Sequence, residues 1–106
     1  MKGAVYNNGV LAGHIERTAT GYRFGYTDEY FQSTANPPIS LTFPKTQQEY
    51  ESDVLFAFFQ GLLSEGINKD IQCRLLKIDE NDDFTRLLQT AGDDTIGAIT
   101  VKPIDE

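Results

Sequence analysis

The sequence predicts an α+β fold, with an antiparallel β-sheet or small open barrel of about five strands packed against about three helices. Apolar and polar residues alternate near the N-terminus and again near the C-terminus, which is typical of strands. Apolar residues recur every three or four positions through most of the second half, which is typical of helices. Strands come first, helices follow and one strand returns, and this order favours α+β over an alternating α/β fold.

The first 27 residues predict an antiparallel meander of three strands. Residues 3–7 and 10–17 flank Asn8-Gly9, a pair that readily adopts the positive φ angles of a tight hairpin turn. Strict alternation in the second strand would place Leu11 and Ile15 on one face, opposite Val10, Ala12 and His14. After a turn at residues 19–21, a third strand is predicted from the alternating aromatic residues Tyr22, Phe24 and Tyr26.

Two further elements are expected before residue 52. Residues 28–31 can form one helical turn, and Asn36-Pro37-Pro38 excludes regular structure just after it. Residues 39–43 alternate again and predict a fourth strand that ends at Pro44. Residues 45–51 are polar and are expected to be a loop.

Residues 52–68 are expected to form the central helix, on which the other elements pack. Three apolar pairs recur at intervals of four along it, and Ser52 or Asp53 is suited to cap its first turn. Gly66 is expected to end it. The apolar pairs are Val54/Leu55, Phe58/Phe59 and Leu62/Leu63.

Two more helices and a last strand complete the expected fold. Amphipathic spacing predicts a second helix and, after the acidic turn at residues 79–83, a third helix that ends near Gly92. Residues 96–101 predict the returning strand, closed by Pro103. The apolar positions are Ile67, Ile71, Leu75 and Ile78 in the second helix, and Phe84, Leu87, Leu88 and Ala91 in the third.

Length and composition predict one domain over residues 1–106, located in the cytoplasm. Cys73 is the single cysteine, which excludes an intrachain disulfide, and neither a signal peptide nor an apolar run of about 20 residues is found. The net charge of −7 is concentrated in residues 49–94, where four basic residues face eleven acidic ones. Such a chain is not expected to bind nucleic acid directly, because it would repel the phosphate backbone. An acidic surface mostly serves solubility, and a basic protein partner is the other interpretation.

The sequence predicts no catalytic residue, no cofactor-binding residue and no metal ligand. His14 is the only histidine and is expected to be a partly buried sheet residue, and Cys73 an ordinary semi-buried thiol. Gly61 and Gly66 have the spacing of a phosphate loop but lack the lysine that should follow. The acidic residues 79–83 lack the glycine of a calcium loop. None of these residues makes a credible active site.

Five segments, in order, resemble the N-terminal subdomain of HipA-type serine/threonine kinases of bacterial toxin–antitoxin modules. Together they run from about residue 4 to residue 101, nearly the whole chain. Ser64 replaces the proline of the family's LLPEG motif, and the nucleotide-binding and catalytic motifs of the kinase body are not found. The segments are NGVLAGHI (8–15), ISLTFP (39–44), FFQGLLSEGIN (58–68), DDFTRLL (82–88) and GDDTIGAI (92–99).

The resemblance implies a non-catalytic regulatory protein similar to the small HipS-like antitoxins, which bind a separately encoded HipA-like kinase and neutralise it. An alternative is a structural N-terminal lobe that completes a split or truncated kinase, or that mediates binding to a DNA-binding, HipB-like repressor. We expect the partner to bind at the segment between two helices, where glycine allows close backbone approach. An ordinary connection between the helices is the competing interpretation. The predicted partner-binding residues are Ser64, Glu65, Gly66, Ile67 and Asn68.

Overall fold

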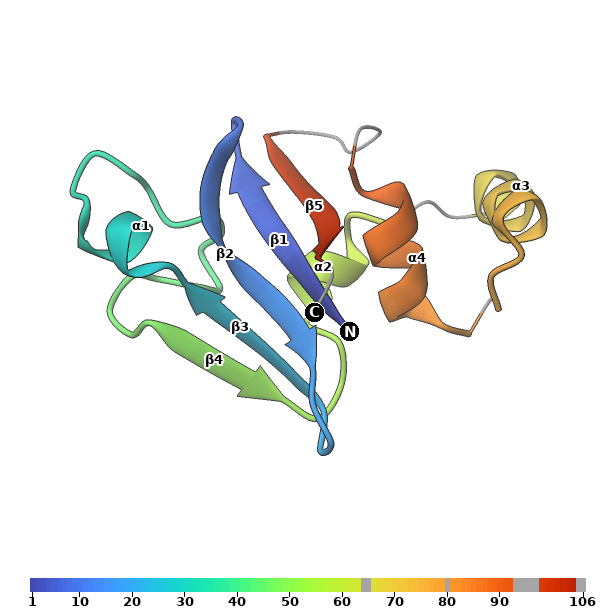
Figure 1. Cartoon of the computed structure of the whole chain (residues 1–106), viewed down its shortest axis with the longest axis horizontal. Coiled ribbons are helices and arrows are strands. Elements are labelled where there is room, and N and C mark those ends of the chain that lie inside the picture. The colour runs from blue at the N-terminus through green and yellow to red at the C-terminus, as the bar shows by residue number, and fades with distance from the viewer. Residues whose placement is uncertain (64–65, 80, 93–97, 105–106) are drawn as a thin grey trace.

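The computed structural model describes residues 1–63, 66–79, 81–92 and 98–104. Its centre is a five-stranded antiparallel sheet with the strand order β4-β3-β2-β1-β5 (Figure 1). The prediction of an α+β fold with about five strands is confirmed. The strands are β1 (Lys2–Asn7), β2 (Val10–Arg17), β3 (Tyr22–Tyr26), β4 (Glu49–Ser52) and β5 (Ile99–Ile104).

Four helices are found among the described residues, one more than expected. The buried side chains of α2 and α4 join those of the sheet in one apolar core, α1 lies near the β4 side, and α3 stands apart beyond α4 (Figure 1). The molecule is therefore elongated, with principal extents of 41 × 29 × 25 Å. The helices are α1 (Asp28–Gln32), α2 (Ala57–Gln60), α3 (Gly66–Leu76) and α4 (Asp83–Thr90).

The predicted hairpin between β1 and β2 is confirmed, but buried and exposed residues do not alternate strictly along β2. Asn8 and Gly9 have φ angles of 51° and 81°, as a tight hairpin turn requires. The pairing then shifts, because Val5 faces Gly13 while Tyr6 faces Leu11, which leaves Ala12 as the extra residue of a β-bulge. The bulge puts Ala12 in the core together with Ile15 and leaves Leu11 exposed. Placing Leu11 and Ile15 on one face was therefore wrong.

The expected strand at residues 39–43 is a turn-rich segment, and the fourth strand is β4, in the segment expected to be a polar loop. Tyrosine side chains supply the hydrogen bonds that a neighbouring strand would otherwise have made. The buried Tyr26 hydroxyl donates to the carbonyl of Phe43 and accepts from the Ile39 amide at 3.1 Å. Tyr30 donates its hydroxyl to the Pro37 carbonyl at 2.6 Å. With these groups satisfied, the segment does not need to pair with the sheet.

The expected central helix over residues 52–68 was wrong as well, because α2 has only four residues. Ser52 ends β4, and α2 starts after the extended residue Phe56, which makes no side-chain cap. The residues spaced by four are nevertheless buried, namely Leu55, Phe59 and Leu63. The sequence pattern therefore identified the buried positions but not the length of the helix.

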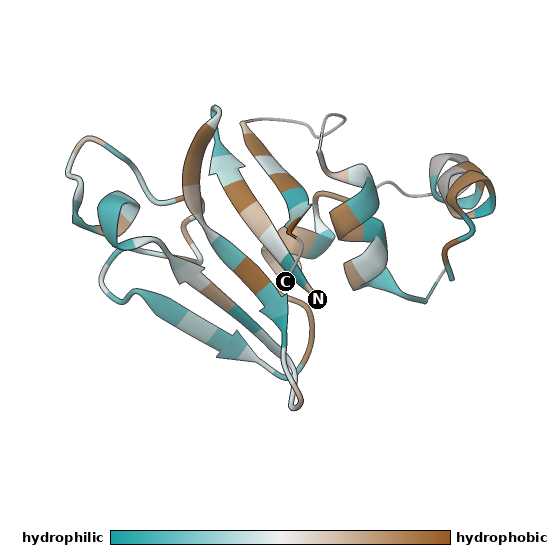
Figure 2. Cartoon of the chain, viewed as in Figure 1, coloured by the Kyte–Doolittle hydropathy of each residue, from teal (hydrophilic) through white to brown (hydrophobic). Residues whose placement is uncertain are grey.

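The core is an aromatic cluster centred on Phe43. Its ring lies 4.9 Å from that of Phe24, 5.2 Å from that of Phe56 and 5.8 Å from that of Phe59, measured between centroids. Phe56 comes directly before α2 and Phe59 lies within it, three residues later, and both rings contact Phe43. Figure 2 shows apolar segments on the central strands and on α2 and α4. These contacts join the sheet, the segment before β4, and α2 into one unit.

The last elements follow the sequence closely. In α4, the expected residues Phe84, Leu87 and Leu88 are all buried. The final strand begins at Ile99 within the described residues and continues through Pro103 instead of ending there. Proline is tolerated because β5 is an edge strand of the described sheet. Residues 96–97 of the expected strand lie outside the described part of the chain.

Candidate partner-binding surface

The predicted partner-binding residues lie where the chain passes from α2 to α3. Ser64 and Glu65 are outside the described residues. The backbone of Gly66, Ile67 and Asn68 forms the first turn of α3. Gly66 therefore begins a helix instead of ending one, which corrects the expectation from the sequence.

The core fixes the point from which this segment leaves the protein. Phe59 of α2 is fully buried, and its ring lies 5.7 Å from that of Phe24. The amides of Leu62 and Leu63 donate at 3.1 Å to the carbonyls three residues earlier, which continues the turn past Gly61. Leu63 is buried. The chain is therefore anchored up to Leu63, one residue before the predicted site.

Beyond that segment, α3 carries an exposed group of large apolar side chains, which we call the α3 surface: Ile71, Leu75 and Leu76. Their exposed fractions are 46%, 75% and 48%. Cys73, on the same helix, is buried. Figure 2 shows apolar residues on α3, at the end of the molecule away from the sheet. An apolar cluster of this kind on a short helix is typical of a surface that contacts another molecule.

The C-terminal end of α3 is defined by a specific backbone motif. Lys77 has a φ angle of 56°, in the left-handed region that favours glycine. The amide of Ile78 donates to the Cys73 carbonyl at 2.9 Å, which is the bond expected when a left-handed residue follows the helix. The motif ends the helix directly after the α3 surface.

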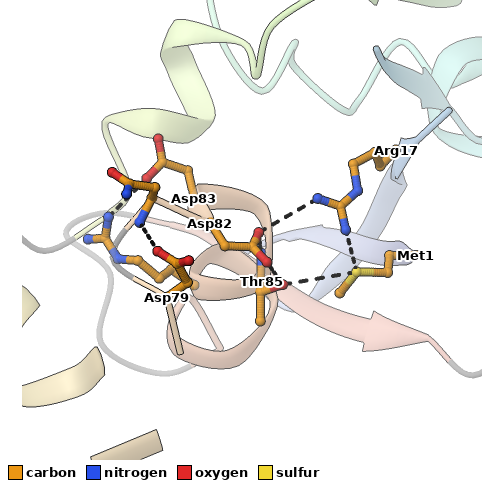
Figure 3. Close-up of polar contacts among 8 residues, drawn as sticks. Met1, Arg17, Asp79, Asp82, Asp83 and Thr85 are labelled. Carbon is orange, nitrogen blue, oxygen red and sulfur yellow. Dashed lines mark hydrogen bonds and ion pairs between the residues drawn. The ribbon is translucent and has the colours of Figure 1, made fainter. Parts of the chain in front are cut away.

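A second surface feature is an open hollow beside the start of α4, lined by four aspartates: Asp53, Asp79, Asp82 and Asp83. Figure 3 shows Asp82 between Thr85 and Arg17. Its carboxylate accepts from the Thr85 amide at 3.1 Å and from the Thr85 hydroxyl at 2.8 Å. The Arg17 guanidinium is 3.6 Å away. These contacts make Asp82 the N-terminal cap of α4.

The same contacts determine how Asp82 titrates. Partial burial alone would raise the pKa of its carboxyl group, but the two hydrogen bonds from Thr85 and the charge of Arg17 outweigh that effect. The pKa of Asp82 therefore lies below its usual range, and the group is ionised at neutral pH. This arrangement makes Asp82 a stabiliser of the start of α4, and Asp83 adds a second acidic residue in its first turn.

His14 and Cys73, the two candidate catalytic residues of the sequence, are both at least partly buried. His14 is half-buried on β2, and burial, with the charge of Lys2, lowers its pKa, although Glu16 acts in the opposite direction. Cys73 is a buried free thiol. Within residues 1–63, 66–79, 81–92 and 98–104, no three His, Cys, Asp or Glu side chains are grouped so that they could hold a metal ion. Among those same residues, no helix is long and apolar enough to cross a membrane.

The sheet, the bulged hairpin and the helices around the aromatic core define a domain class that sequence comparison identifies. The chain belongs to the HipA N-terminal domain family, whose sequence pattern matches residues 3–102. The family resemblance inferred from the five sequence segments is therefore confirmed.

Two particular proteins extend the comparison. A solved structure described as the N-terminal domain of HipA toxin is similar with a TM-score of 0.74 and 32% sequence identity, and the match covers 99% of this chain and 93% of that one. A protein of Haemophilus influenzae without an assigned function is 33% identical over 100 residues, which are 94% of this chain and 90% of that protein. The Haemophilus protein therefore consists almost entirely of this domain.

Sequence reasoning found the helical spacing of Ile71 and Leu75 but not their exposure. Amphipathic spacing indicates that a helix has an apolar side. It does not indicate whether that side packs against the core of the same domain or stays exposed. The sequence did contain one sign that this helix differs from its surroundings. Three of the four charged residues in 67–78 are basic, whereas this half of the chain is otherwise acidic.

Proposed function

We propose that this chain is a non-catalytic regulatory domain that binds a separately encoded HipA-like kinase and neutralises it, as the antitoxin of a toxin–antitoxin module. The observation that carries the proposal is the family match over residues 3–102. The N-terminal subdomain of HipA is a non-catalytic region of that protein. A chain built on this subdomain acts by contact with another protein.

Two further observations support a free-standing role. The related Haemophilus influenzae protein is almost entirely this domain, so the domain exists in a protein with little else. The α3 surface exposes three large apolar side chains. In a regulatory domain of this kind, such a surface is available for the kinase.

The test combines binding with kinase activity. A purified HipA-like kinase is the proposed partner, and its autophosphorylation is measured with increasing amounts of the chain. We expect a stable complex and loss of autophosphorylation near one equivalent. A kinase that keeps its full activity at a several-fold excess of the chain would refute the proposal. A rise in activity would instead support the alternative, in which the chain completes the kinase as a structural lobe.

A further inference from the structure

We propose that α3 is the docking helix of this domain and that it inserts the α3 surface into an apolar groove on the partner whose rim carries carboxylates. This inference rests on the proposed function, because the partner is taken to be the HipA-like kinase. It adds the helix that makes the contact and the chemistry of the groove that receives it.

The large apolar side chains of α3 are placed where a partner can reach them. Ile71 and Leu75 are one helical turn apart, so they lie on the same side of α3, and Leu76 is next to Leu75. Leu75 is three-quarters exposed. The helix stands at the end of the molecule beyond α4, which leaves space around it for a partner (Figure 1). A groove that covers these side chains would remove a cluster of apolar surface from water.

The helix that carries the α3 surface is also rich in basic residues. Lys69, Arg74 and Lys77 lie on α3 or directly after it, and Asp70 is the only acid of residues 66–78. None of the three cations forms an ion pair with a carboxylate of the described residues. By contrast, three other cations are paired, at 3.6 Å or less: Arg17 with Asp82, Arg23 with Glu16 and Arg86 with Asp83.

These charges indicate what kind of partner fits. Residues 66–78 carry a net charge of +2 on a chain of −7, so the rest of the chain carries −9. An apolar helix that carries several cations matches an apolar groove with carboxylates at its rim. A basic amphipathic helix can also bind an anionic membrane. The strongly acidic remainder of this chain would be repelled by such a surface, which favours a protein groove.

The experiment measures the dissociation constant between the chain and the purified kinase, for the wild type and matched variants. Leu75→Ser is expected to weaken binding at least about tenfold, because it removes an apolar side chain from the groove. Leu41→Ser is the control: Leu41 is 99% exposed and belongs to the segment before β4, not to α3. Its binding is expected to match that of the wild type. Both substitutions replace exposed side chains, so the thermal unfolding midpoints should stay close to that of the wild type.

A second pair of variants tests the charge. Arg74→Glu is expected to weaken binding several-fold and to reduce the loss of affinity between 50 and 300 mM salt, since it replaces a cation facing the acidic rim. Lys102→Glu makes the same charge change on an exposed residue of β5, where it should have little effect.

The results separate this inference from the proposed function. Complete absence of binding by the wild-type chain overturns both. Wild-type binding that neither Leu75→Ser nor Arg74→Glu weakens overturns the docking helix alone and leaves the proposed function in place. Sedimentation of the free chain as a dimer that Leu75→Ser dissociates would assign the α3 surface to a second copy. Arg74-dependent binding to phosphatidylserine vesicles would assign it to a membrane. Either of these last two results overturns the inference.

Discussion

Gly13 on β2 gives a sharp test of how the sheet is assembled. A Cβ atom at Gly13 would lie 2.2 Å from the carbonyl oxygen of Gly25 on β3, whereas ordinary contacts begin at 3.4 Å. The obstacle is backbone, so Gly13→Ala must separate β2 from β3 by more than about 1 Å. Gly25→Ala is the matched control, because its nearest atom is the flexible Cγ of Glu49 at 3.4 Å.

The size of the effect follows from this geometry. Overpacking a well-packed site costs about 1–3 kcal/mol, and one disturbed ladder hydrogen bond adds about 1 kcal/mol. We therefore expect Gly13→Ala to lower the free energy of unfolding by about 2–4 kcal/mol. That is a large share of the roughly 5–15 kcal/mol typical of a domain. Gly25→Ala is expected to change the free energy of unfolding by less than about 1 kcal/mol.

Thermal unfolding followed by far-ultraviolet circular dichroism measures the difference. For a domain of this size, each kcal/mol moves the midpoint by about 4–8 °C, so Gly13→Ala should unfold at least about 8 °C below the wild type and at least about 4 °C below Gly25→Ala. Equal midpoints for the two alanine variants would refute the close approach of β2 and β3 at the bulge. The same result would remove our explanation for the glycine at the sixth position of NGVLAGHI.

Four further predictions concern single side chains. Tyr26→Phe should cost about 2–3 kcal/mol in urea unfolding, because it leaves the Ile39 amide and a buried carbonyl unpaired; an unchanged urea midpoint would contradict the role given to this hydroxyl. Lys77→Gly should raise the free energy of unfolding of α3, measured by hydrogen exchange, by up to about 1 kcal/mol, since glycine adopts the positive φ angle without strain; slower exchange only outside α3 would count against it. Asp82→Ala should lower the free energy of unfolding by about 0.5–2 kcal/mol at pH 7, because it removes the N-terminal cap of α4. Because the pKa of Asp82 is lowered, this cost should disappear as the pH falls through that pKa, and a cost that stays constant down to pH 2 would disprove the assignment. His14 has a lowered pKa in the folded state, so the unfolded chain binds the proton more readily and stability should fall as the pH drops below about 6.5. His14→Gln should lose less stability than the wild type between pH 7.5 and 5.5, and equal losses would show that other groups titrate there.

Local features of the fold could be predicted because neighbouring residues alone decide them. The hairpin turn at Asn8-Gly9 depends on which residues tolerate positive φ, and α4 has both a cap and a regular apolar stripe. The family could be predicted as well, because its five segments keep their order along the chain. For the candidate site, the sequence predicted the helical spacing of Ile71 and Leu75.

Other features depended on contacts between distant residues. Residues 39–43 alternate like a strand, yet the hydroxyls of Tyr26 and Tyr30 satisfy backbone groups of residues 37–43, and β4 takes the sheet edge instead. Phe56, whose ring contacts Phe43, has an extended backbone and precedes α2, so the expected long helix is reduced to four residues.

Residue type and spacing were enough to predict the family, the class of fold, the first hairpin and the apolar positions of the helices. Contacts between distant segments set which segment pairs at the sheet edge, where the helices end and which apolar side of a helix stays exposed. The physical reason is that a side chain is buried by whatever the folded chain places opposite it, and spacing along the sequence does not contain that information.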